Sequence, residues 1–122
     1  MKLTNQQIYT YALNLNDAFS DNTQKLPMKI NFYLQKNKST LIALAQEIEA
    51  NRMDIIRTYG EPVDDGERFN ISPDKIADAQ KELNDLLNLE QEVTIYTISA
   101  DSLTDDISLT TGQMEAILFM VI

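Results

Sequence analysis

Two groups of neighbouring carboxylates are the residues whose types and spacing offer the most direct chemistry. They lie in a predicted turn and a predicted loop: Asp64, Asp65 and Glu67 in the turn, and Asp101, Asp105 and Asp106 in the loop. Carboxylate oxygens bind Mg²⁺ and Ca²⁺, and paired carboxylates can act as acid and base on a glycosidic bond. Neither group has EF-hand spacing, and nearness in sequence does not make several oxygens converge on one ion. We therefore interpret both groups as solvated acidic loops and predict no metal site and no cofactor.

A cluster of basic residues next to aromatic residues offers a second kind of chemistry. Its members are Lys25, Lys29, Lys36 and Lys38, which surround Phe32 and Tyr33. Basic residues beside aromatic rings can hold single-stranded nucleic acid by charge and by base stacking. The formal net charge of −9 opposes this, because an acidic protein repels a phosphate backbone. We expect a solvated helix face, or a patch that pairs with the acidic half of the protein, and we do not expect a nucleic-acid partner.

The sequence contains no Cys and no His. This excludes disulfides, thiolate nucleophiles and Cys-based metal sites. It also removes the usual general base near neutral pH and every Ser–His or Cys–His arrangement. With three Gly in the chain, a dinucleotide-binding or Walker motif cannot be written. We predict a protein that is not an enzyme and has no catalytic residue.

Length and charge distribution describe a single acidic domain. A chain of 122 residues is long enough for one core, and we predict one domain over residues 1–122. Residues 1–60 hold seven Lys or Arg and five Asp or Glu, whereas residues 61–122 hold three and fourteen. The second half is thus strongly acidic. The apolar run Ala116–Ile122 is far shorter than a membrane span of about 20 residues, so we expect a soluble intracellular protein that does not bind membranes.

Most of the chain has the pattern of α-helices. Thr4 and Gln7 fit a capping box that starts the first helix. Pro27 precedes a long helix over residues 28–59, in which an apolar residue recurs every seven positions: Leu34, Leu41, Ile48 and Ile55. Such a repeat favours packing along another helix, inside the chain or in a second copy. The polar segment 36–39 leaves open whether this helix is continuous.

Two further helices and one strand pair complete the predicted fold. Ser72 and Pro73 start a third helix, and Thr110 and Gln113 form a second capping box. Residues 93–98 alternate with a period of two, which is typical of a strand. We predict that they pair antiparallel with residues 68–71. The expected fold class is therefore α+β, mostly α, with about four helices.

The C-terminal segment is apolar on every side. A helix with this pattern is typically buried. Phe119, Met120 and Ile122 are nevertheless our candidates for the apolar part of a surface that contacts a partner. The six carboxylates of the turn and the loop are the candidates for its acidic part.

Four segments of the sequence carry a resemblance to a known family. They are MKLTNQQIYTYALNL at the start, KLPMKINFYLQKNKSTLIALAQEIE with MDIIRTYG in the middle, KELNDLLNLEQEV, and LTTGQMEAILFMVI at the end. Together they resemble small proteins of unknown function from tailed phages and prophages of Gram-positive bacteria. The resemblance covers nearly the whole chain but includes no catalytic motif. It implies a phage-encoded protein that is made in the host cell cytoplasm.

These observations give two functional hypotheses. The first is a non-enzymatic binding or assembly protein whose partner is a phage protein, a host protein or a second copy of itself. The alternative is an inhibitor of a host defence or nucleic-acid enzyme, in which acidic side chains take the place of a phosphate backbone. The sequence leaves open the identity of the partner, the oligomeric state and whether the protein enters the virion.

Overall fold

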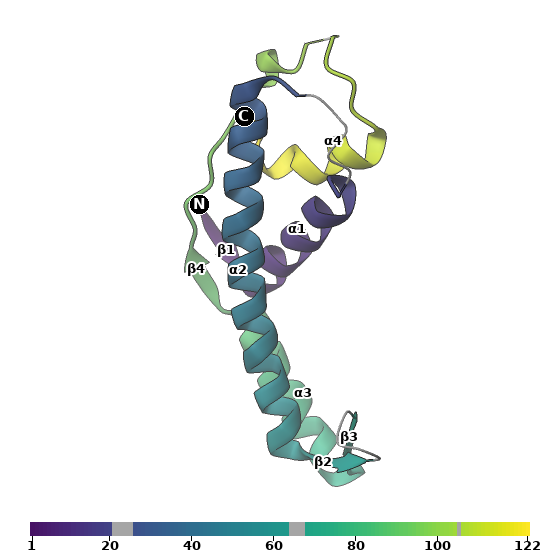
Figure 1. Cartoon of the computed structure of the whole chain (residues 1–122). Helices are drawn as coiled ribbons and strands as arrows, with labels where there is room; N and C mark the ends of the chain where they lie inside the picture. Colours follow the sequence, from purple (N-terminus) through teal and green to yellow (C-terminus); the bar gives the residue numbers. More distant parts are fainter. Residues whose placement is uncertain (21–25, 64–67, 105) are drawn as a thin grey trace.

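The computed structural model of the chain describes residues 1–20, 26–63, 68–104 and 106–122 (Figure 1). In this part of the chain there are four α-helices: α1 (Asn5–Ala18), α2 (Met28–Tyr59), α3 (Pro73–Asn88) and α4 (Thr111–Ile117). Four short strands accompany them: β1 (Lys2–Thr4), β2 (Gly60–Val63), β3 (Arg68–Ile71) and β4 (Glu90–Glu92). The predicted α+β class, mostly α with one long helix, is confirmed.

The long helix α2 is the spine of the molecule. Its 32 residues span about 48 Å. Figure 1 shows α1, α4 and the C-terminal segment beside the first part of α2, whereas α3 and the β2–β3 hairpin lie along its last part. We call residues 1–52 and 86–122 the head, and residues 53–85 the arm. The helix runs without a break through residues 36–39, which answers the question that the sequence left open.

Local sequence signals explain where the helices begin. The Thr4 hydroxyl accepts a hydrogen bond from the Gln7 backbone N–H at 3.1 Å, and the Gln7 side chain accepts one from the Thr4 N–H at 2.9 Å. Thr110 and Gln113 repeat this exchange at 3.1 and 3.0 Å. Each box gives partners to N–H groups that the helix itself leaves free. Both predicted capping boxes are confirmed.

The hydrophobic core lies in the head. It combines apolar side chains of β1, α1, α2, the segment after β4, α4 and the C-terminal segment: Leu3, Ile8, Ala12, Leu15, Phe19, Ile30, Leu34, Leu41, Ile48, Val93, Ile98, Ala116, Ile117 and Met120. Three members of the seven-residue repeat are buried, whereas Ile55 is half-buried. Ile55 lies in the arm, where fewer elements cover α2. The repeat thus packs against helices of the same chain.

The predicted pairing of residues 68–71 with residues 93–98 is wrong. Residues 68–71 form β3 and pair with β2, with Gly60 opposite Ile71. Strand β4 ends at Glu92 and pairs with β1, with Leu3 opposite Gln91. Residues 93–97 lie in no strand, and Ile98 makes an isolated bridge to Val121.

The course of α3 explains why residues 68–71 and residues 93–98 do not pair. Its 16 residues separate its two ends by about 24 Å, whereas paired strands lie about 5 Å apart. Residues 68–71 precede α3 at the end of the arm, and residues 93–98 follow it in the head (Figure 1). Each segment therefore pairs with the backbone that is nearest at its own end of the molecule.

The backbone at Gly60, where β2 begins, leaves no room for a side chain, because an added Cβ would lie 2.8 Å from the Ile56 carbonyl oxygen.

Candidate functional site

Only two of the six acidic candidates, Asp101 and Asp106, are among the described residues. Asp64, Asp65, Glu67 and Asp105 lie outside the described residues. Asp101 and Asp106 are exposed in the head. Strands β2 and β3, which flank residues 64–67, lie at the far end of the arm (Figure 1). The described elements next to these two segments thus lie at opposite ends of the molecule.

Short local hydrogen bonds involve the two described members of the acidic loop. The Asp101 backbone N–H donates to the Ser99 hydroxyl oxygen at 3.2 Å. The Thr104 hydroxyl donates to the Asp106 carboxylate. This hydrogen bond lowers the pKa of Asp106 below its ordinary value, since it favours the charged form. Among the residues that the structure describes, no three His, Cys, Asp or Glu side chains gather as a metal site.

The three apolar candidates at the C-terminus have different environments. Met120 is completely buried in the core, so its assignment to a partner surface was wrong. Phe119 is half-buried, and its ring stacks on the Tyr11 ring with centroids 4.4 Å apart. Ile122 is 76% exposed, and so is Leu118 at 59%, which the sequence analysis did not single out. The segment is therefore not buried on every side, because α4 is short and covers only one side of the core.

The described helices include none that is long and apolar enough to cross a membrane.

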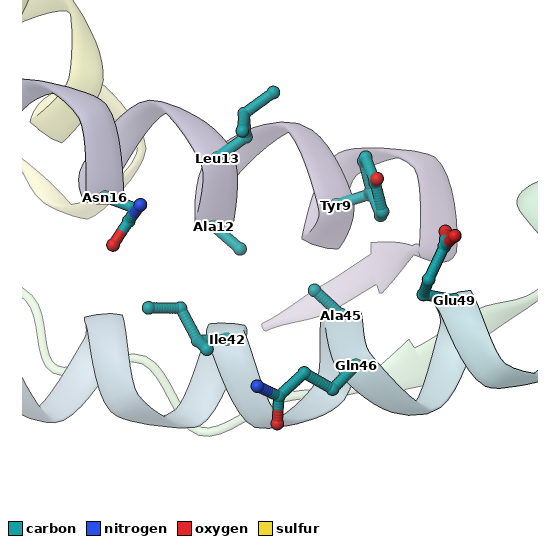
Figure 2. A pocket seen from close by; sticks show the side chains of 8 residues that line it. All are labelled: Tyr9, Ala12, Leu13, Asn16, Ile42, Ala45, Gln46 and Glu49. Atoms are coloured by element: carbon teal, nitrogen blue, oxygen red, sulfur yellow. The ribbon is translucent and has the colours of Figure 1, made fainter.

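A shallow, mostly apolar groove lies between α1 and α2 on the head (Figure 2). It has a volume of about 300 Å³. Four residues of each helix line it: Tyr9, Ala12, Leu13 and Asn16 of α1, and Ile42, Ala45, Gln46 and Glu49 of α2. We call it the α1–α2 groove.

The groove has an apolar centre and a polar edge. Figure 2 shows Ile42 and Ala45 directed from α2 toward α1, and Ala12 directed back toward α2. The small Ala12 and Ala45 side chains leave the space that a larger residue would fill. On the α1 edge, Tyr9 is 37% exposed and Leu13 is 52% exposed. An apolar centre with a polar edge is the usual composition of a protein–protein interface.

A charged pair lies at one end of the groove. Arg52 holds the Glu49 carboxylate with two hydrogen bonds, from Nε at 2.8 Å and from Nη2 at 2.6 Å. This contact lowers the pKa of Glu49 and raises the pKa of Arg52. Both groups therefore stay charged at neutral pH, and this end of the groove provides a fixed carboxylate beside a fixed guanidinium.

Sequence reasoning missed the groove, although one signal was present. Tyr9, Leu13 and Asn16 have the spacing of one helix face. That face lies next to the buried stripe that begins with Ile8. An exposed Leu beside a complete core stripe is a weak signal, because many proteins expose single apolar side chains. The hollow depends on how α1 lies on α2, which periodicity alone does not give.

Two lysines of the basic cluster, Lys29 and Lys36, lie on one exposed face of α2 in the head, whereas Lys38 lies on the other side of this helix. Lys29 Nζ lies 5.7 Å from the centroid of the Tyr33 ring, and Lys36 Nζ lies 5.5 Å from that of Phe32. Lys38 donates to the Phe19 carbonyl oxygen at 3.5 Å. Lys25 lies outside the described residues.

Comparisons of this chain with protein-family models, with curated proteins and with solved structures gave no match.

Proposed function

We propose that this protein is a non-enzymatic binding protein, encoded by a phage and acting in the host cell cytoplasm, that attaches to another protein through the α1–α2 groove. The observation that carries the proposal is the exposed Leu13 side chain beside the hollow over Ala12 and Ala45. The phage setting rests on the sequence resemblance alone. The partner on this view is a phage or host protein that takes part in assembly.

The shape of the groove suits an amphipathic helix. It follows α1 from Tyr9 to Asn16, a length of about 10 Å. This is room for two turns of a partner helix, whose apolar side chains at positions i and i+4 would fill the hollow. Leu13 is already about half covered in the free protein, so covering the rest of its side chain is worth about 1 kcal/mol. Because the hollow is shallow and open along its length, it suits a protein segment better than an enclosed small molecule.

A capture experiment with one matched control tests the proposal. The protein is immobilised, incubated with lysate from phage-infected cells, and the bound proteins are identified by mass spectrometry. We expect Leu13→Asp to lose the partner, since it removes the apolar contact and adds a charge, with a loss of affinity of at least roughly thirtyfold. Asn14→Asp introduces the same charge on the next residue, which is outside the groove, and should keep the partner. Capture of the same partner by both variants would exclude the groove as the binding site.

The alternative function, inhibition of a host enzyme by a decoy of the phosphate backbone, has one supporting observation. Asp74, Asp78 and Glu82 are exposed on α3, with about 6 Å of helix between successive carboxylates. Lys75 and Lys81 are exposed on the same helix and weaken such a decoy. Salt separates the two functions: binding of a decoy should weaken steeply as ionic strength rises, whereas apolar binding in the groove should not.

A further inference from the structure

The exposed face of α2 in the head carries an unusual combination of side chains. Lys29, Phe32, Tyr33 and Lys36 follow the spacing of one helix face. Phe32 is 53% exposed. The Tyr96 ring extends this face, because it stacks on Tyr33 with centroids 5.2 Å apart and is 39% exposed. We call these five residues the basic–aromatic stripe.

The two lysines of the stripe have no acidic partner among the described residues. No Asp or Glu occurs in the sequence between Asp21 and Glu47. The ion pairs of the described residues involve other cations: the Met1 ammonium group, Lys2, Arg52 and Arg57. Lys29 and Lys36 lie over aromatic rings instead. The stripe therefore presents two ammonium groups and a large apolar area that no described carboxylate balances.

The arm carries the complementary charge. Asp74, Asp78, Glu82 and Asp85 are all exposed on α3. Glu82 also accepts a hydrogen bond from the Tyr59 hydroxyl, which raises the pKa of Tyr59. These four carboxylates outnumber Lys75 and Lys81 of the same helix. Carboxylates three or four residues apart therefore still repel one another, and a further cation relieves that repulsion. We call these four residues the acidic row.

The spacing of the two sets agrees. Asp78 and Asp85 are seven residues apart, as are Lys29 and Lys36. Seven residues of helix correspond to about 10 Å, so two helices lying side by side can form both charge pairs at once. Phe32 would lie between the pairs, where an aromatic anchor contributes most.

The stripe cannot reach the acidic row of its own chain. Met53, where the arm begins, follows Lys36 by seventeen positions in the same continuous helix, a distance of about 25 Å. Figure 1 shows α3 beside the last part of α2, away from the end that carries the stripe. We propose that the basic–aromatic stripe on the head of one molecule binds the acidic row on the arm of a second copy.

This contact joins two different surfaces. Each molecule offers a stripe and an acidic row, so such contacts continue from copy to copy until they close into a ring or extend as a chain. Nucleic acid fits the stripe less well. The lysines already lie over Phe32 and Tyr33 and Tyr96 stacks on Tyr33, which leaves less free ring surface for bases.

Charge-exchanged variants test the contact in the full-length protein. Sedimentation velocity over a concentration series at low ionic strength should show self-association of the wild type that weakens with salt. Lys29→Glu with Lys36→Glu, and separately Asp78→Lys with Asp85→Lys, should each weaken self-association at least about tenfold. An equimolar mixture of the two double variants should associate again, because the exchanged charges are complementary. Lys29→Arg with Lys36→Arg should associate like the wild type.

Three results would overturn the proposal. The first is a wild type that stays monomeric at every concentration, and the second is self-association that neither double variant weakens. The third is a mixture of the double variants that stays monomeric although circular dichroism shows both to be folded.

If the wild type is monomeric but binds a fluorescent single-stranded oligonucleotide, and Lys29→Glu with Lys36→Glu abolishes that binding, the stripe is a nucleic-acid site instead. Leu13→Asp should leave self-association unchanged, which separates this contact from the α1–α2 groove.

Discussion

At the scale of single residues, Asn37 shows how a polar side chain in a core position can hold a chain segment that lies in no strand. It is completely buried. Its Oδ1 accepts a hydrogen bond from the Tyr96 N–H at 2.8 Å, and its Nδ2 donates to the Tyr96 carbonyl oxygen at 2.8 Å. The side chain thus binds both polar groups of one residue in a segment that has no strand partner. This satisfies backbone groups that would otherwise cost free energy on burial.

We expect Asn37→Leu to destabilise the protein by about 1–3 kcal/mol, although Leu has nearly the same size and is the better helix former. The variant leaves the Tyr96 N–H and carbonyl groups without the amide that binds them. Chemical denaturation measures the free energy of unfolding. Asn51→Leu is the control, because Asn51 is exposed on the same helix and its amide bonds only to the Glu47 carbonyl oxygen. Equal losses in the two variants would contradict this role of Asn37.

At the scale of elements, the sequence predicts where helices begin better than it predicts which strands pair. Helix starts depend on contacts within four residues, such as those of Thr4 with Gln7, and these can be read locally. Strand pairing depends on which distant segments the tertiary fold brings side by side. Lys2–Thr4 and Glu90–Glu92 are nearly ninety residues apart, and neither has a strong alternating pattern. The α1–α2 groove could not be predicted from the sequence for the same reason, because it is formed by two helices whose contact depends on the tertiary fold.

The corrected pairing makes a prediction about proline substitutions. We expect Gln91→Pro to lower the free energy of unfolding by more than about 2 kcal/mol, because Pro cannot donate in a ladder and Gln91 lies opposite Leu3 in the β1–β4 pair. Thr94→Pro should cost less than about 1 kcal/mol, because Thr94 is exposed and lies in no strand. Thermal melts of both variants measure the difference. The reverse order would mean that residues 93–98 form the paired strand after all.

At the scale of the whole molecule, burial is divided unevenly between head and arm. The head holds the core cluster, whereas Ala79 is the one buried residue among the described residues of the arm. Helix α2 nevertheless belongs to both parts. Its hydrogen-bonding pattern is the same throughout, so differences in stability along it must come from what packs on it. The proposed contact between copies places the acidic row of a sparsely packed arm against a well-packed head, and the arm would lose conformational freedom on binding.

Hydrogen exchange along α2 tests this division, because local opening free energies follow the burial of the surrounding side chains. We expect amides of residues 38–48, which include the buried Leu41 and Ile48, to exchange at least about tenfold more slowly than those of residues 53–59. Both peptides come from one continuous helix and are measured in the same sample, so solvent conditions are matched. Mass spectrometry of peptic fragments resolves the two segments. If self-association covers the arm, protection of residues 73–85 should also rise with protein concentration in the wild type and not in Lys29→Glu with Lys36→Glu. Equal exchange of the two α2 segments at low concentration would mean that the arm is as stable as the head and that its packing is not the weak part of the molecule.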